Sequence, residues 1–77
     1  MLNNRLVETV SRTLRLEPSA IRPDTTTENT PLWDSVAHLN LILEVESVFG
    51  VRFSSEEIPS LTSVSRLQEA LQRENAL

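Results

Sequence analysis

The segment between Asp34 and Gly50 constrains the fold of this chain most strongly. Its apolar residues recur with the spacing of an α-helix from Ser35 to Phe49. Asp34 suits the N-cap, because its carboxylate can accept hydrogen bonds from the free N–H groups of the first turn and favours the positive end of the helix dipole. Gly50 suits the end of the helix, because glycine enters the left-handed conformation freely. We therefore expect a helix over residues 35–49.

The same periodicity indicates two further helices. Apolar residues at helical spacing are Leu6, Val7, Val10 and Leu14 near the N-terminus, and Val64, Leu67, Ala70 and Leu71 near the C-terminus. We expect helices over about residues 3–15 and 64–74, the second of them capped by Thr62 or Ser63.

The connection between the first two helices is long and has no sustained period. It runs from Leu16 to Trp33 and contains three prolines, which exclude a continuous helix. A loop of this length in a compact domain is uncommon and tends to be functional. We expect Leu16, Ile21 and Leu32 to anchor it in the core, and Trp33 to act as an apolar anchor before the helix in the manner of a hydrophobic staple.

A short helix is expected between Ser54 and Pro59. Ser54 and Glu57 fit the spacing of a capping box, and Pro59 would end the helix. The expected fold is therefore all-α. It is a small bundle of three main helices plus one short helix, with a long loop between helices one and two, forming a single domain over residues 1–77.

The composition excludes several classes of function. With 77 residues and no cysteine, the chain can hold one small core but no disulfide, thiolate zinc site or cysteine nucleophile. Its one histidine cannot by itself form a two-histidine metal site. The longest apolar run, Leu41-Ile42-Leu43, is far shorter than the ~20 residues of a membrane span, and the N-terminus has no signal-peptide core. We expect a cytoplasmic protein that does not enter a membrane.

The charge is negative and unevenly distributed. Seven arginines against eleven acids give a net charge of −4, which disfavours nucleic-acid binding because no basic patch can neutralise phosphates. Residues 33–62 carry this whole excess, with five acids and one arginine. The acids are Asp34, Glu44, Glu46, Glu56 and Glu57. Such a surface can serve solubility alone or can steer a basic partner.

The helix over residues 35–49 is apolar on two sides. At about 100° per residue, one sector contains Leu41, Ile42, Val45, Val48 and Phe49, and is an ordinary core stripe in which Val45 and Phe49 are expected to be buried. A second sector, the apolar face, contains Val36, Leu39 and Leu43. Neighbouring helices could bury both sectors. Alternatively, the apolar face stays exposed as a docking patch, with an acidic rim formed by Glu44, Glu46, Glu56 and Glu57.

Ser35 and His38 lie about one helical turn apart at the start of the same helix. Such a pair could serve as the nucleophile and base of a small hydrolase. No third group is evident to orient the imidazole, and the domain has little room for an oxyanion pocket. We therefore expect His38 to be a half-buried structural residue near the helix start.

The segment that begins at Trp33 resembles the acyl carrier protein family. That family has an Asp-Ser-Leu motif, an apolar and acidic helix that ends near a Phe, an apolar-X-apolar segment, and a Thr-Val start to the final helix. In these places the present sequence has Asp34-Ser35-Val36, Glu44 to Phe49, Val51 to Phe53, and Thr62-Ser63-Val64. The resemblance covers nearly the whole chain, and it includes the long first loop.

The resemblance implies that Ser35 carries 4′-phosphopantetheine, received from coenzyme A through a phosphopantetheinyl transferase. Asp34 would cap the helix and help the transferase to recognise or coordinate the site. The thiol of the arm would hold an acyl or aminoacyl group as a thioester. The chain would then be a monomeric, non-catalytic carrier. Its other partners would be an acyl- or aminoacyl-loading enzyme and downstream acyl-transfer or condensing enzymes, which would dock on the apolar face and the acidic rim.

Several positions depart from the family pattern. Trp33 replaces the usual glycine, as in a subset of carriers with a Trp-Asp-Ser motif, and Val36 replaces the common leucine. Ala37 and Asn40 stand where fatty-acid carriers commonly have acids. These differences favour a specialised pathway, such as polyketide, nonribosomal-peptide or related biosynthesis. The alternative is an unmodified acidic module that binds another protein.

Overall fold

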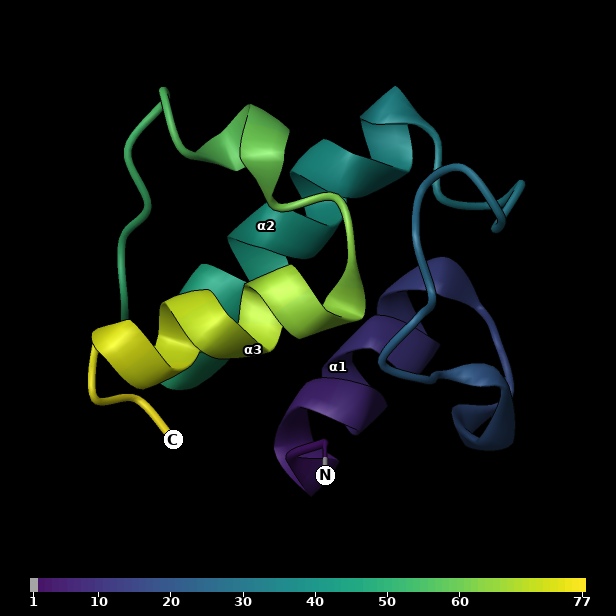
Figure 1. Ribbon diagram of the computed structural model, residues 1–77, viewed down its shortest axis with the longest axis horizontal. Coiled ribbons are helices and arrows are strands. Elements are labelled where there is room, and N and C mark those ends of the chain that lie inside the picture. The colour runs from purple at the N-terminus through teal and green to yellow at the C-terminus, as the bar shows by residue number, and fades with distance from the viewer. Residues whose placement is uncertain (1) are drawn as a thin grey trace.

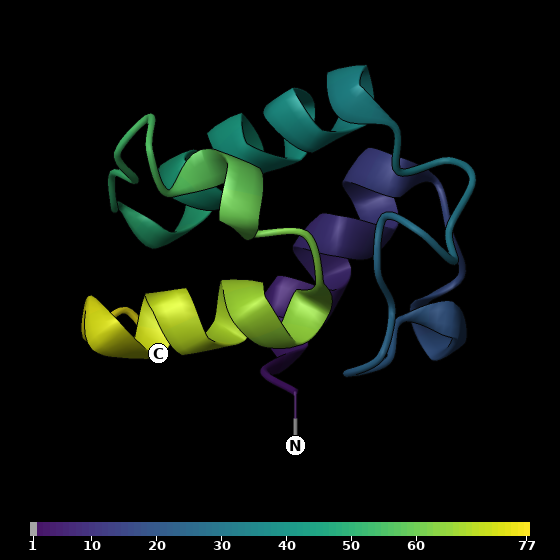
Figure 2. The same cartoon turned by 45° about the horizontal axis from the view of Figure 1, so that its top comes forward.

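The computed structural model describes residues 2–77 and contains three α-helices in that range. They are α1 at Asn4–Leu14, α2 at Ser35–Phe49 and α3 at Val64–Arg73, joined by segments that include two 3₁₀ turns, η1 at Pro18–Ala20 and η2 at Ile58–Ser60. Figure 1 shows the long loop at one side of the bundle, beyond α1, and Figure 2 shows η2 between α2 and α3. The expected all-α bundle is confirmed. None of the described helices has the length and apolarity needed to cross a membrane.

The ends of α2 follow from its flanking residues. The Asp34 carboxylate accepts a hydrogen bond from the Ala37 N–H at 2.8 Å, and Gly50 adopts the left-handed conformation with φ 67°. In that conformation the N–H of Gly50 donates to the carbonyl of Glu46 and satisfies one of the free acceptors at the helix end. The helix therefore has the bounds that the sequence predicts.

Side-chain caps also begin the other two helices. The Asn3 side chain accepts hydrogen bonds from the N–H groups of Arg5 and Leu6 at 2.9 and 3.2 Å, and the Ser63 hydroxyl accepts from the Arg66 N–H at 3.1 Å. Of the two caps considered for α3, the structure therefore uses Ser63. Each cap satisfies first-turn donors that the helix itself cannot pair.

The long loop is held against the start of α3 by backbone hydrogen bonds. The N–H of Thr27 donates to the carbonyl of Thr62, and the N–H of Val64 donates to the carbonyl of Thr25, both at 3.0 Å. This antiparallel contact joins residues that are far apart in the sequence. Ile21 is buried and Leu16 packs against the core, as expected of loop anchors.

The expected burial of Leu32 is wrong, because its side chain is 54% exposed. The N–H of Trp33 donates to the carbonyl of Thr30 at 2.9 Å and closes a turn, with Leu32 at the tip of that turn. The neighbouring indole enters the core instead, at 1% exposed. One of the two adjacent apolar side chains is therefore buried and the other faces solvent.

The expected short helix is also different in the structure. Residues 55–57 form a turn, and the only helical part is η2 at Ile58–Ser60, so that Pro59 lies inside this 3₁₀ turn and does not end a helix. Half of the capping box forms, since the Ser54 hydroxyl accepts from the Glu57 N–H at 3.1 Å. The carboxylate of Glu57 pairs with Arg73 of α3 instead of returning to Ser54.

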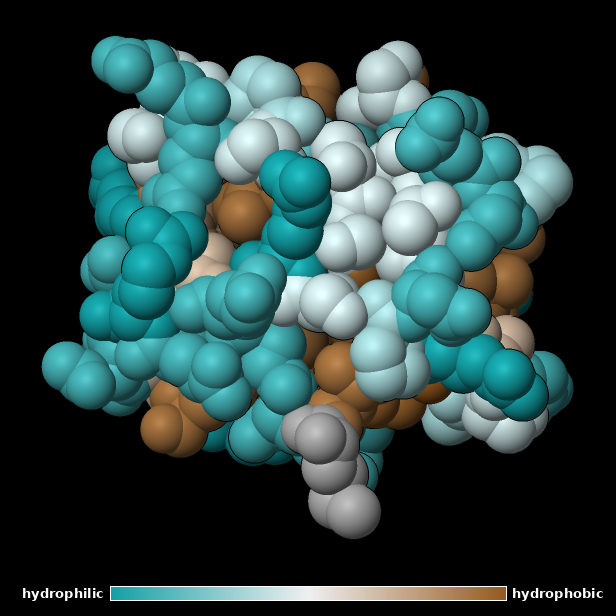
Figure 3. Space-filling model, viewed as in Figure 1, coloured by the Kyte–Doolittle hydropathy of each residue, from teal (hydrophilic) through white to brown (hydrophobic). Residues whose placement is uncertain are grey.

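One hydrophobic core joins the three α-helices, the loop and the segment after α2. It contains Leu6, Val10, Leu14, Ile21, Trp33, Leu41, Ile42, Val45, Phe53, Leu61, Val64, Leu67, Ala70 and Leu71. Val45 is fully buried as expected, but Phe49 is only partly buried, and the Arg5 guanidinium lies 5.1 Å from the centre of its ring. Figure 3 shows a largely hydrophilic surface on the face seen there, with hydrophobic atoms visible mainly in gaps and at the edges.

The two apolar sectors of α2 predict opposite responses to the same substitution. Leu41 is fully buried, whereas Leu43 is 64% exposed. Leu41→Ala should lower the free energy of unfolding by about 2–5 kcal/mol through lost burial and the cavity left behind. Leu43→Ala should change it by at most about 0.5 kcal/mol. Urea denaturation of the two variants measures the difference, and equal losses would contradict the assignment of faces.

Candidate functional site

Ser35 is the first residue of α2 and is exposed to solvent. Its position follows from its two neighbours on the N-terminal side. Trp33 is buried in the core, and Asp34 is bonded to the first turn as the N-cap. The backbone of Ser35 is therefore held in place on the surface, because the neighbouring Trp33 cannot move without disturbing the core.

The first turn of α2 leaves donors free beside this hydroxyl. Asp34 takes two of the first-turn N–H groups, because its carboxylate accepts from Ala37 and its carbonyl accepts from His38 at 2.8 Å. The N–H groups of Ser35 and Val36 have no hydrogen-bond partner among residues 2–77. Unpaired first-turn donors together with the helix dipole favour an anion at this end of a helix. A phosphodiester on Ser35 fits this environment.

A hydrogen-bonded pair of rings lies beneath the site. The indole Nε1–H of Trp33 donates to Nδ1 of His38 at 3.0 Å, and Nε2 of His38 lies 2.9 Å from the carbonyl oxygen of Ile58. Since Nδ1 is the acceptor of the indole proton, Nε2 carries the imidazole proton and donates it to Ile58. The pair therefore links the end of the long loop, the first turn of α2 and η2.

This arrangement does not form the nucleophile–base pair that the spacing of Ser35 and His38 suggested. Both ring nitrogens of His38 are engaged by Trp33 and Ile58, and the imidazole is only 9% exposed. A general base must reach the proton that it removes. His38 instead fills the place where a staple residue contacts the side chain before the cap, and it is more deeply buried than the sequence predicted.

The apolar face of α2 is exposed, so neighbouring helices do not bury both apolar sectors of this helix. Val36, Leu39 and Leu43 are 68%, 58% and 64% exposed. Leu32 is a further exposed leucine, three residues before Ser35, that the sequence analysis missed. The turn-forming Thr30-Pro31 pair before it was the available signal, since proline and threonine commonly start turns.

The residues of the expected acidic rim have different environments. The carboxylate of Glu46 accepts from the Phe53 N–H at 2.8 Å and holds the chain after α2, and Glu57 pairs with Arg73. Glu44 forms an exposed ion pair with Arg12 at 3.3 Å. Glu56 is exposed and is bonded to no other described residue. The structure therefore leaves fewer free carboxylates beside the apolar face than the sequence predicts.

Two clefts lie near these elements. The smaller, of about 260 Å³, includes Ser35 and is lined by Thr27, Trp33, Asp34, Ser35, His38 and Thr62. The larger, of about 670 Å³, lies between η2 and α3 and is lined by Ser60, Leu61, Arg66, Glu69, Gln72 and Arg73. No group of three or more potential metal-ligating side chains occurs within residues 2–77.

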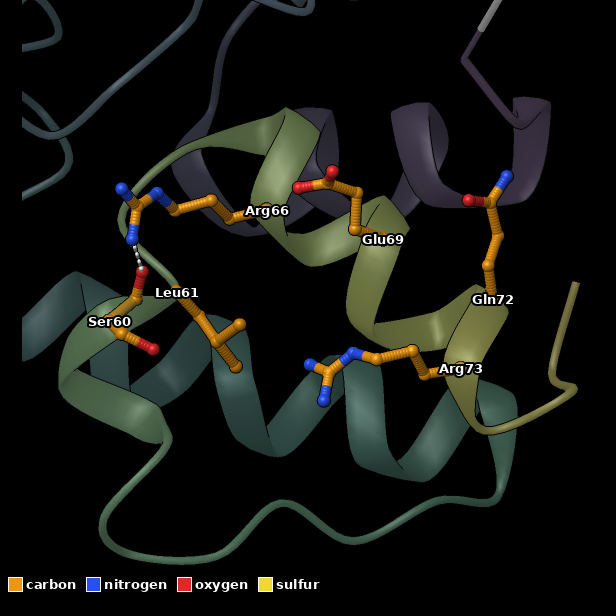
Figure 4. Close-up of a pocket in the computed structure, with 6 residues that line it drawn as sticks. All are labelled: Ser60, Leu61, Arg66, Glu69, Gln72 and Arg73. Carbon is orange, nitrogen blue, oxygen red and sulfur yellow. Dashed lines mark hydrogen bonds between the residues drawn. The ribbon is translucent and has the colours of Figure 1, made fainter.

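The larger cleft is spanned by arginine contacts, which the sequence analysis did not identify. Figure 4 shows Arg66 reaching from α3 to the backbone of η2, where it donates to the Ser60 carbonyl at 3.2 Å. Arg73 binds Glu57, and this hydrogen bond and charge raise the pKa of Arg73. Both guanidinium groups thus have acceptors within the chain. Their contacts across the cleft hold α3 against η2 and the residue before it.

The contact between Trp33 and His38 predicts a measurable coupling energy. Trp33→Phe leaves Nδ1 of a buried imidazole without its donor, which should cost about 1–3 kcal/mol. In a double-mutant cycle with His38→Ala, the two losses should be non-additive by about 0.5–3 kcal/mol, because they remove the same hydrogen bond. Chemical denaturation of the four proteins measures this coupling. Additive losses would show that the bond contributes nothing of its own.

No family model matches the chain, and no curated protein matches its sequence. The interpretation of Ser35 as an attachment site therefore depends on the geometry of the helix start and on the residues that resemble a carrier motif.

Proposed function

We propose that this chain is a carrier protein of the acyl carrier type and that Ser35 is its attachment site. The observation that carries the proposal is the placement of an exposed serine at the start of α2, directly after a bonded Asp34 cap and a buried Trp33. The free N–H groups beside the hydroxyl favour a phosphodiester. The resemblance of residues 33–64 to the family supplies the identity of the group.

The modification would be the transfer of phosphopantetheine from coenzyme A by a phosphopantetheinyl transferase. The Ser35 oxygen would form a bond to the phosphorus that carries the pantetheine arm, the diphosphate bond of coenzyme A would break, and adenosine 3′,5′-bisphosphate would leave. The serine proton would pass to a base on the transferase. Asp34 would remain the cap and take part in recognition by the transferase. The arm supplies a thiol, which this cysteine-free chain lacks.

The proposal includes a cytoplasmic monomer that serves a loading enzyme and later acyl-transfer or condensing enzymes of a specialised biosynthetic pathway. Those enzymes, and the transferase that modifies Ser35, would bind the exposed apolar face next to Ser35. A mixed interface with an apolar centre and a charged rim is common in transient complexes. Glu46 and Glu57 bind within the chain, whereas Glu44 has only an exposed ion pair with Arg12. We therefore assign the contact mainly to Val36, Leu39 and Leu43, with Glu44 and Glu56 at the rim.

An unmodified interaction module is the second candidate, and the exposure of the apolar face supports it equally. The two functions differ in whether Ser35 accepts a group.

Incubation of the chain with coenzyme A and a broad-specificity transferase should raise its intact mass by one phosphopantetheine. Ser35→Ala should remain folded, since an exposed first-turn residue contributes little to packing, and should show no gain in mass. Ser47→Ala, which changes an exposed serine of the same helix, should gain the group normally.

An unchanged mass for the wild-type chain would refute the carrier function and leave the interaction module. A mass gain in Ser35→Ala would show that the site is elsewhere.

The docking surface makes a separate prediction. Leu39→Ala and Leu43→Ala should each reduce kcat/KM of the transferase by about 5–30-fold, as expected when an interface residue worth about 1–2 kcal/mol is truncated. Their melting temperatures should stay close to the wild-type value, because both side chains are exposed. Glu56→Lys should slow the reaction most at low salt, where exposed charges are least screened. Wild-type rates in both leucine variants would exclude the apolar face as the binding surface.

A further inference from the structure

The cleft beside Ser35 has a floor made of two buried aromatic rings. Trp33 and His38 both line it, yet they are only 1% and 9% exposed. Their ring centroids are 6.0 Å apart with 34° between the planes, and the indole N–H is bonded to the imidazole at 3.0 Å. The rings therefore lie between the cleft and the core as one connected unit.

This floor is tied to the structure on three sides. Trp33 belongs to the end of the loop, His38 to the first turn of α2, and the Nε2–H of His38 donates to the Ile58 carbonyl of η2 at 2.9 Å. Core residues Leu41 and Leu61 are at most 2% exposed. Movement of either ring would leave buried polar groups without partners, which is costly in a protein interior.

The rest of the cleft lining is polar, in contrast to the two rings of the floor. Thr27 and Thr62 line it, and they are adjacent because the Thr27 N–H donates to the Thr62 carbonyl at 3.0 Å. Neither threonine hydroxyl has a hydrogen-bond partner among residues 2–77. Asp34 is the one acidic residue among those that line the cleft. Free hydroxyls in a cleft with one acidic residue and no lysine or arginine suit an uncharged chain that carries hydroxyl and amide groups.

We propose that the Trp33–His38 hydrogen bond closes the bottom of this cleft, so that the arm on Ser35 lies along Thr27 and Thr62 while a cargo on its thiol stays outside the helical core. This inference depends on the proposed carrier function. It makes Trp33 and His38 residues that position the arm and decide where the cargo lies. The acyl chain then contributes nothing to the stability of the fold, and the thioester remains available to solvent and to partner enzymes.

The test compares the unloaded pantetheine form with acetyl- and octanoyl-loaded forms of the same protein. A broad-specificity transferase prepares them from coenzyme A, acetyl-coenzyme A and octanoyl-coenzyme A, and intact mass verifies each product. The three wild-type forms should melt at the same temperature within error, and the single tryptophan should give the same fluorescence in each. Trp33→Ala opens the floor, so its octanoyl form should melt higher than its acetyl form by about 5 °C, because apolar chain is then buried.

Two variants serve as controls. Ser47→Ala changes an exposed residue of the same helix, and its loaded forms should melt together like those of the wild type. His38→Ala removes the acceptor and leaves the indole in place, so it tests the floor if Trp33→Ala does not fold. Its octanoyl form should melt above its acetyl form.

The outcomes separate this inference from the proposed function. A wild-type octanoyl form that melts above the acetyl form would overturn the closed floor while leaving Ser35 as the attachment site. Loaded forms of a folded Trp33→Ala or His38→Ala that melt together would also overturn it. A wild-type chain that gains no mass from coenzyme A would refute the carrier function and this inference with it.

Discussion

Burial of Trp33 is the contact on which the geometry around Ser35 depends. A large aromatic side chain buries about 150–250 Å², and the indole reaches this burial at the end of a loop with few other apolar anchors. Its N–H would be costly if unpaired, and His38 supplies the acceptor at 3.0 Å. Because the imidazole belongs to the first turn of α2, the same bond fixes the loop relative to the helix. Ser35 lies between these two residues in the sequence and is placed by both.

The two faces of α2 show how a small domain divides its apolar residues. Leu41, Ile42 and Val45 are buried against the rest of the bundle, and they account for the contribution of this helix to the core. Val36, Leu39 and Leu43 add nothing to that core. Three large apolar residues exposed on one side of a helix are unusual for a monomer surface and are typical of an interaction site. Under the proposed function, their place beside Ser35 suits a partner that must reach the hydroxyl.

The sequence predicted the elements that depend on local chemistry. The bounds of α2 follow from an aspartate cap, a helical period and a single glycine, and all of these act over a few residues. The sequence did not predict Glu46 as a side-chain acceptor for the Phe53 N–H, because this bond depends on how the chain turns after Gly50. The pairing of Glu57 with Arg73 likewise joins residues 16 apart, and it takes the place of the return contact from Glu57 that a full capping box would have. Leu32 and Trp33 were indistinguishable as apolar neighbours until the turn at Thr30 selected one for the core.

The candidate site therefore has a buried side, Trp33 and His38, which positions Ser35. It also has an exposed side, the apolar face of α2, which is accessible to another protein. A domain of this size has about 3–5 kcal/mol of total stability available from its core. Loss of the Trp33 contact would remove a large part of that, so substitutions there change the fold and the site together. Leu39 and Leu43 are outside the core, so the side chains on that face can vary without loss of the fold. Between the two sides, Ser35 has a rigid position and an accessible hydroxyl, which an attachment site needs and which neither the core nor the surface would supply alone.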